Sequence, residues 1–189
     1  MQSPWIQSLL IIGLSIVACV TYGILHDQIT ARICVEYFTI GHIPLFGGIQ
    51  DPTLLGLVWG VLATWWVGAM LGIPLAFVSQ VGSMVRKPAR DLIVPLLVVM
   101  AVSAGLAAVA GVVGYVVASQ GSVWLLEPMA SRVPPDRHVA FLTDLWIHNA
   151  SYAGGFLGGI VLMLWVVYDR FRRSYKLERK TAGEKVSSA

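Results

Sequence analysis

The chain is poor in charge. Only 12% of its 189 residues are Asp, Glu, Lys or Arg, whereas soluble domains carry roughly 25%. It also has only two cysteines, Cys19 and Cys34, and no CxxC pair. The shortage of charge argues against a soluble globular protein, and the missing CxxC pair argues against a thiol oxidoreductase.

Several well-known motifs are missing as well. The sequence contains no HExxH zinc motif, no CxxCH for covalent haem attachment and no glycine-rich phosphate loop. No RNA- or DNA-binding motif accompanies its basic residues, so we expect no nucleic-acid partner. Any site in this protein must therefore be found from residue placement rather than from a short signature.

Hydrophobic residues make up 57% of the chain and are concentrated in four long runs. We predict membrane spans at residues 5–25, 53–78, 92–118 and 146–168. Each is long enough to cross a hydrocarbon core of ~30 Å, which takes about 20 helical residues. Lipid offers no partner for an open strand edge. The sequence therefore predicts an all-α, multi-pass membrane protein, with a four-transmembrane-helix bundle over 1–168 and a basic tail over 169–189.

The basic residues predict the orientation. Three of the thirteen Lys and Arg residues lie in the second connection (Arg86, Lys87, Arg90) and seven more in the tail, ten in all on one side. By the positive-inside rule, we expect both termini in the cytoplasm and the tail against anionic lipid. The short connections fit a bacterial inner (cytoplasmic) membrane.

The first span contains Ile16-Val17-Ala18-Cys19, which is similar to a lipoprotein cleavage site. No Lys or Arg precedes this apolar run, although secretory signals carry a charged start. We therefore expect an uncleaved first helix.

Small residues recur at four-residue spacing, a pattern that lets membrane helices approach closely. The second span carries Gly56, Gly60, Thr64, Gly68 and Gly72, and the fourth carries two such rows, Ala150/Gly154/Gly158 and Ser151/Gly155/Gly159. These glycine-zipper faces suit either a tight monomeric bundle or packing against other membrane subunits or a second copy.

All four histidines lie in, or at the edge of, the first or third connection, which puts them on one predicted side of the membrane. His26 ends a polar stripe of the first span, and His148 shares a face with Asp144 and the glycines of the fourth span. Polar groups on a membrane helix usually face protein or water. We therefore predict that His26 and His148 point into the bundle, and assign His42 and His138 to the surface.

The segment after the first span keeps an apolar four-residue period through Leu25, Ile29, Ile33 and Tyr37. This spacing predicts that the helix continues beyond the membrane. Arg32 and Glu36 would then form an i,i+4 ion pair.

These placements predict a metal site at the outer (periplasmic) membrane surface. We expect His26, His148 and a carboxylate from Asp27, Glu36 or Asp144 as ligands. Such mixed ligands suit zinc, iron or copper, and an open position would activate water or oxygen. Haem b is a less favoured variant. Whether the protein is an enzyme stays open at this point.

Three alternatives stand beside the metal site. The same groups could simply satisfy helix ends and pair with Arg32. The protein could be a non-catalytic small subunit or assembly factor that packs through its glycine faces. A transporter or channel is the least favoured, because the spans lack a buried charge pair or a broken-helix repeat.

Overall fold

The computed structural model describes residues 3–43 and 48–187, with side chains up to residue 183. The chain is 82% helix, and the described part contains no strand. Four stretches are long and apolar enough to cross a membrane, as predicted, which indicates a multi-pass membrane protein. They comprise α1 (Pro4–Ile33), α3 (Pro52–Leu62) with α4 (Trp65–Gln80), α5 (Ile93–Ser119) preceded by the 3₁₀ turn η1 (Ala89–Leu92), and α7 (His138–Ser187).

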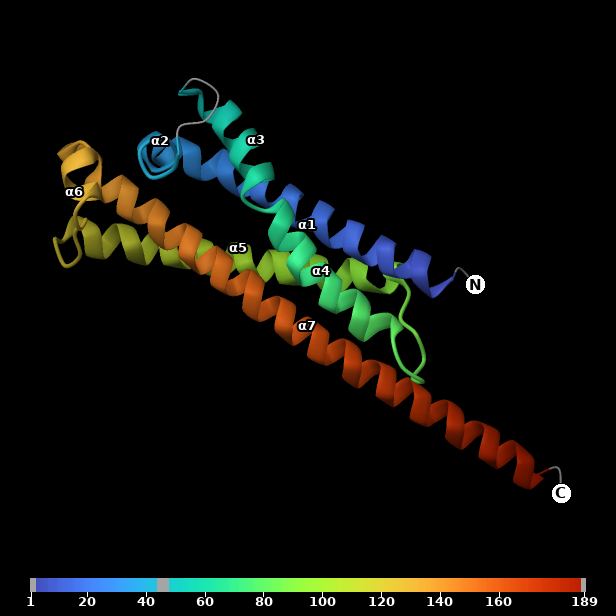
Figure 1. Ribbon diagram of the computed structural model, residues 1–189. Helices are drawn as coiled ribbons and strands as arrows, with labels where there is room; N and C mark the ends of the chain where they lie inside the picture. The colour runs from blue at the N-terminus through green and yellow to red at the C-terminus, as the bar shows by residue number, and fades with distance from the viewer. Residues whose placement is uncertain (1–2, 44–47, 188–189) are drawn as a thin grey trace.

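The connections contain three short helical elements. The helix α2 (Val35–Thr39) follows α1, whereas α6 (Met129–Arg132) and the 3₁₀ turn η2 (Pro135–Arg137) lie between α5 and α7. We call the end of the molecule that bears these elements the histidine end, because it carries His26, His42, His138 and His148. We call the opposite end, where α4 joins η1, the basic end (Figure 1).

The helix boundaries differ from the predicted ones in four places, of which the first is the start of α7 at His138 instead of residue 146. The helix α1 continues past residue 25, as the apolar period indicates, but it ends at Ile33 and a new helix starts after Cys34. The second span is interrupted between α3 and α4 at Thr64. Beyond the predicted end of the fourth span at residue 168, α7 continues as helix to Ser187 and projects beyond the other helices (Figure 1).

The long helices form two close pairs, α1 with α3 and α4, and α5 with α7 (Figure 1). Glycine permits the first pairing. A Cβ atom added to Gly60 would lie 2.5 Å from the Ile24 Cα, and one added to Gly68 would lie 2.6 Å from the Ile16 Cα. Backbone atoms cannot move away from such contacts as a flexible side chain could, so larger residues would force the two helices apart.

The two glycine rows of α7 have different neighbours. Gly154 packs against Ser103 of α5, and Gly158 packs against Val99 of the same helix. In the second row, a Cβ at Gly159 would meet Leu71 of α4 at 3.2 Å, whereas one at Gly155 would have no described atom within 4 Å. The first row therefore closes the α5–α7 pair, and the second faces the space between the two pairs. Gly56 and Gly72 likewise contact α1.

At the basic end, Arg170 of α7 is only 2% exposed and binds the chain that follows α4. Its guanidinium donates hydrogen bonds to the backbone carbonyls of Val78, Val81, Met84 and Val85. The last carbonyls of a helix have no partner within the helix. Arg170 thus satisfies the end of α4 and holds the following connection against α7.

A second contact strengthens this attachment. Lys87 is 2% exposed, its Nζ lies 2.6 Å from Asp169 Oδ2, and it stands 3.9 Å from the centre of the Trp165 ring. The ion pair with Asp169 and the cation–π contact with Trp165 both join this connection to α7, on residues that precede Arg170 on the helix.

We predict that Gly60→Ala lowers the free energy of unfolding by about 1–3 kcal/mol, because the added methyl group would overlap the α1 backbone. The measurement is SDS titration of the purified protein from mild detergent, followed by tryptophan fluorescence. Gly105→Ala is the control, since Gly105 is exposed on α5 and has open space around it. Equal stability of the two variants would contradict the close α1–α3 contact.

We predict that Arg170→Met costs about 1–3 kcal/mol, because it leaves the buried backbone carbonyls at the end of α4 without their hydrogen-bond donor. Arg172→Met removes the same charge from an exposed position of α7 and should change stability by no more than about 0.5 kcal/mol. The same SDS titration measures both. If the two variants unfold alike, Arg170 does not hold the α4 end.

Candidate metal centre

A cavity of about 130 Å³ lies between the two helix pairs. Its walls come from α1 and α4 on one side and from α5 and α7 on the other, and residues of α2 contribute at the histidine end. The side chains of His26, Asp27 and His148 line it there. The predicted inward orientation of the two histidines agrees with this placement.

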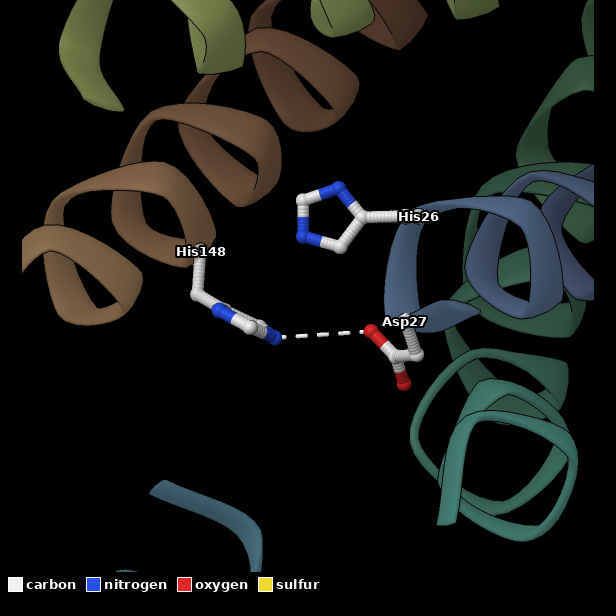
Figure 2. A group of neighbouring side chains, drawn as sticks. All are labelled: His26, Asp27 and His148. Carbon is white, nitrogen blue, oxygen red and sulfur yellow. Dashed lines mark ion pairs between the residues drawn. The ribbon is translucent and has the colours of Figure 1, made fainter. Parts of the chain in front are cut away.

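His26, Asp27 and His148 come together from two helices that are far apart in sequence (Figure 2). One potential ligand atom from each residue lies within 4.8 Å of the others, so the group could hold a metal ion. His148 Nε2 and Asp27 Oδ1 are 3.4 Å apart. Asp27 and His148 are 5% and 7% exposed, and His26 Nε2 is buried with no hydrogen-bond partner in the described structure.

The backbone fixes the orientation of the His148 ring. Its Nδ1 lies 2.8 Å from the carbonyl oxygen of Asp144, one turn earlier on α7. A carbonyl oxygen can only accept, so Nδ1 carries the proton and donates it. In the neutral ring, Nε2 then presents a lone pair towards Asp27. A histidine whose other nitrogen donates to a carbonyl is the usual arrangement of a metal ligand.

Aromatic rings enclose the imidazoles. The Tyr37 ring stacks on His148 with 4.3 Å between centroids, and the His26 ring meets His148 edge-on at 4.7 Å. On the cavity wall, the Tyr22 hydroxyl and the Ser151 hydroxyl are 2.7 Å apart. These contacts limit ring rotation, so the donor atoms are held in place rather than left free to turn.

Glu36 is not part of this group. Its Oε2 lies 3.0 Å from Arg137 Nε, and Arg137 also donates to the carbonyl of Ile33. Although burial raises the pKa of the Glu36 carboxyl, hydrogen bonds from its own backbone and from Arg137 outweigh it and hold the pKa below its usual value. Glu36 therefore ties α2 to η2, directly before α7.

The predicted Arg32–Glu36 ion pair is wrong. Arg32 donates hydrogen bonds to Gln28 and Thr53 instead. The i,i+4 spacing needs one continuous helix, but α1 ends at Ile33 and the chain turns at Cys34, where the backbone is extended. Burial raises the pKa of the Cys34 thiol to about 12, so this cysteine stays protonated at neutral pH.

The third predicted carboxylate, Asp144, lies nearby in a different role. Its side chain is fully buried, and neither carboxylate oxygen has a hydrogen-bond partner among the described residues. It is the backbone carbonyl of Asp144, rather than the carboxylate, that binds His148. Among the three predicted carboxylates, Asp27 is the one grouped with both histidines.

His42 lines the cavity as well, although the sequence pattern predicts a surface position for it. Its Nδ1 donates to the carbonyl of Tyr37, and its ring lies 4.5 Å from that of Trp59. Burial lowers the pKa of His42. No periodic signal reveals this position, because His42 follows the end of α2 in irregular chain. His138, by contrast, binds the carbonyl of Val133 and does not line the cavity.

Haem does not fit between the two histidines as they lie. Their ring centroids are 4.7 Å apart and the rings meet edge to face, which leaves no room for a porphyrin plane between them. A single ion needs no such space.

Comparison of the chain with protein-family models, with curated proteins and with solved structures gives no match. The geometry of the site is therefore the basis for assigning a function.

Proposed function

We propose that this membrane protein binds one divalent transition-metal ion through His26, Asp27 and His148. Two imidazoles and one carboxylate form the ligand set of catalytic zinc sites and of non-haem iron sites. Both kinds of site keep an open position beside their three protein ligands. Zinc and iron are thus the preferred occupants, with copper as a weaker candidate.

The separation of His148 and Asp27 carries this proposal. A hydrogen bond between an imidazolium and a carboxylate is about 2.7–2.9 Å long, but these two atoms are 3.4 Å apart. Two ligands that bind one zinc ion at about 2.1 Å with tetrahedral angles are about 3.4 Å apart. The spacing therefore suits a shared ion better than a shared proton.

An open coordination position would face the cavity. A metal there can lower the pKa of a bound water molecule or polarise an oxygen atom of a ligand. The Tyr22 and Ser151 hydroxyls on the cavity wall could donate hydrogen bonds to such a ligand. We therefore propose that the centre is catalytic and that its substrate enters the cavity.

We also propose that the histidine end faces the outside of a bacterial inner membrane. The support is the charge distribution, with ten of thirteen basic residues in the α4–α5 connection or beyond residue 168. The metal would then lie at the outer surface, where it can be acquired without crossing the membrane.

The alternative of a small subunit or assembly factor has less support. It was motivated by the glycine faces, yet Gly56, Gly60, Gly68, Gly72, Gly154, Gly158 and Gly159 all contact other helices of the same chain. These residues therefore provide no argument for a second protein.

The test is the metal content of protein purified without chelators. We expect about one transition metal per chain, and its loss in Asp27→Asn, His26→Ala and His148→Ala. Removing a ligand should weaken binding by more than the 10–100-fold that outer-shell changes cost. Elemental analysis identifies the metal, and titration of chelated protein with Co²⁺, followed by its visible absorption, measures affinity.

Two variants serve as matched controls. Asp144→Asn changes the other buried carboxylate but keeps the backbone carbonyl that binds His148, so metal content should stay near one. His138→Ala changes a histidine at the same end that lies outside the group and should also keep the metal. Metal-free wild-type protein that fails to bind Zn²⁺, Fe²⁺ or Co²⁺ would overturn the proposal, as would equal loss in Asp27→Asn and Asp144→Asn.

A further inference from the structure

The cavity continues well below the histidines, along the membrane-spanning part of the helices. On α1 it is lined from His26 down to Ser15, and on α7 from His148 down to Leu162. Ser15 and His26 are eleven positions apart, about 16 Å along a helix, and His148 and Leu162 are fourteen positions apart, about 21 Å. A hydrocarbon core of ~30 Å gives each leaflet about half of that thickness, ~15 Å. The cavity is therefore at least as deep as one leaflet.

The lower part of the cavity is lined mainly by carbon atoms. Leu71, Leu96, Val99 and Leu162 contribute to its walls. The hydroxyl of Ser15 donates to the Ile11 carbonyl of its own helix, so it is not available to a ligand. Ser103 is the exception, since it is buried and its hydroxyl has no partner in the described structure. An apolar cavity of this kind stays dry and takes apolar guests.

The cavity is also elongated. Its volume of about 130 Å³ extends over a depth of at least about 16 Å along the helices. Gly155 lines it, and no described atom lies within 4 Å of a Cβ added there. An extended hydrocarbon chain suits this elongated shape and its apolar walls.

The cavity therefore has a polar upper part and an apolar lower part, in the same order as the polar ester region and the acyl chain of a lipid. The upper end offers two imidazoles, a carboxylate and the Tyr22–Ser151 hydroxyl pair, and the lower end offers hydrocarbon. We propose that the cavity holds one acyl chain of a membrane phospholipid, with its ester region at His26 and His148 and its second chain in the bilayer. The binding of this acyl chain does not depend on the proposed metal site. The identification of this lipid as the substrate rests on the proposed function.

The experiment uses the purified full-length chain in vesicles of phosphatidylcholine that contain a phosphatidylcholine analogue with a diazirine on one acyl chain. After illumination, mass spectrometry locates the labelled residues. We expect labelling of cavity residues such as Leu71, Val99 and Met100, in addition to the lipid-exposed surface. In Gly155→Leu, which adds a side chain to a cavity-lining position with open space beside it, labelling of these residues should fall at least tenfold.

Gly105→Leu is the matched control, because it adds the same side chain to an exposed glycine with open space around it. It should leave cavity labelling unchanged, and SDS titration of both variants checks that each is folded. Labelling confined to the exposed surface in the wild type would overturn the proposal. Equal cavity labelling in Gly155→Leu and Gly105→Leu would do the same. If Gly155→Leu does not fold, the smaller Gly155→Val variant provides the test, and cavity labelling in it equal to that of the wild type counts against the proposal.

The two proposals are separated by the His148→Ala variant and by metal-free protein. If cavity labelling persists when the metal is lost, the result supports binding of the acyl chain. Whether that lipid is the substrate then depends on the metal measurements. Normal metal content with no cavity labelling would keep the metal centre and overturn the lipid site.

Discussion

The close approach of helices within each pair is the constraint on which the rest of the structure depends. Gly60 and Gly68 bring the backbone of α3 and α4 against α1, and Gly154 brings α7 against Ser103 of α5. Each helix pair is therefore tightly packed, and the two pairs contact each other through side chains rather than through backbone. Where α7 presents Gly155 to that second interface, no side chain fills the gap. The same kind of residue thus closes one interface and opens the other.

The candidate metal centre exists only when the two pairs are docked. The first pair supplies His26 and Asp27, and the second supplies His148. At the opposite end, Arg170 of α7 binds the carbonyls at and after the end of α4, so it fixes how far one pair is shifted along the other. A shift of one helical turn, about 5.4 Å, would separate the three ligand atoms completely. The buried contact at the basic end therefore positions a site at the other end.

Much of this fold follows from hydrophobic length and spacing. The four spans, the inward orientation of His26 and His148 and the close-packing glycines are visible in the sequence, because lipid enforces helices and small residues mark their contacts. The break at Cys34 cannot be predicted from the sequence, yet it determines which residues pair with Glu36 and Arg32. The choice of Asp27 over Asp144, and the place of His42, depend on how separate helices meet, which no local period encodes.

The buried carboxyl groups at the histidine end each need a proton or a cation. Two carboxylates, Asp27 and Asp144, are almost fully buried there. The basic residues of this end do not neutralise them by direct contact: Arg137 pairs with Glu36, Arg32 binds Gln28 and Thr53, and Arg132 is exposed. A buried carboxylate without a counter-charge is costly in a membrane protein, so each of these groups is stabilised either by taking up a proton or by binding a cation. A metal ion held by Asp27 and the two histidines would stabilise the ionised form of Asp27, whereas Asp144, which lies outside the group, is neutral when it carries a proton.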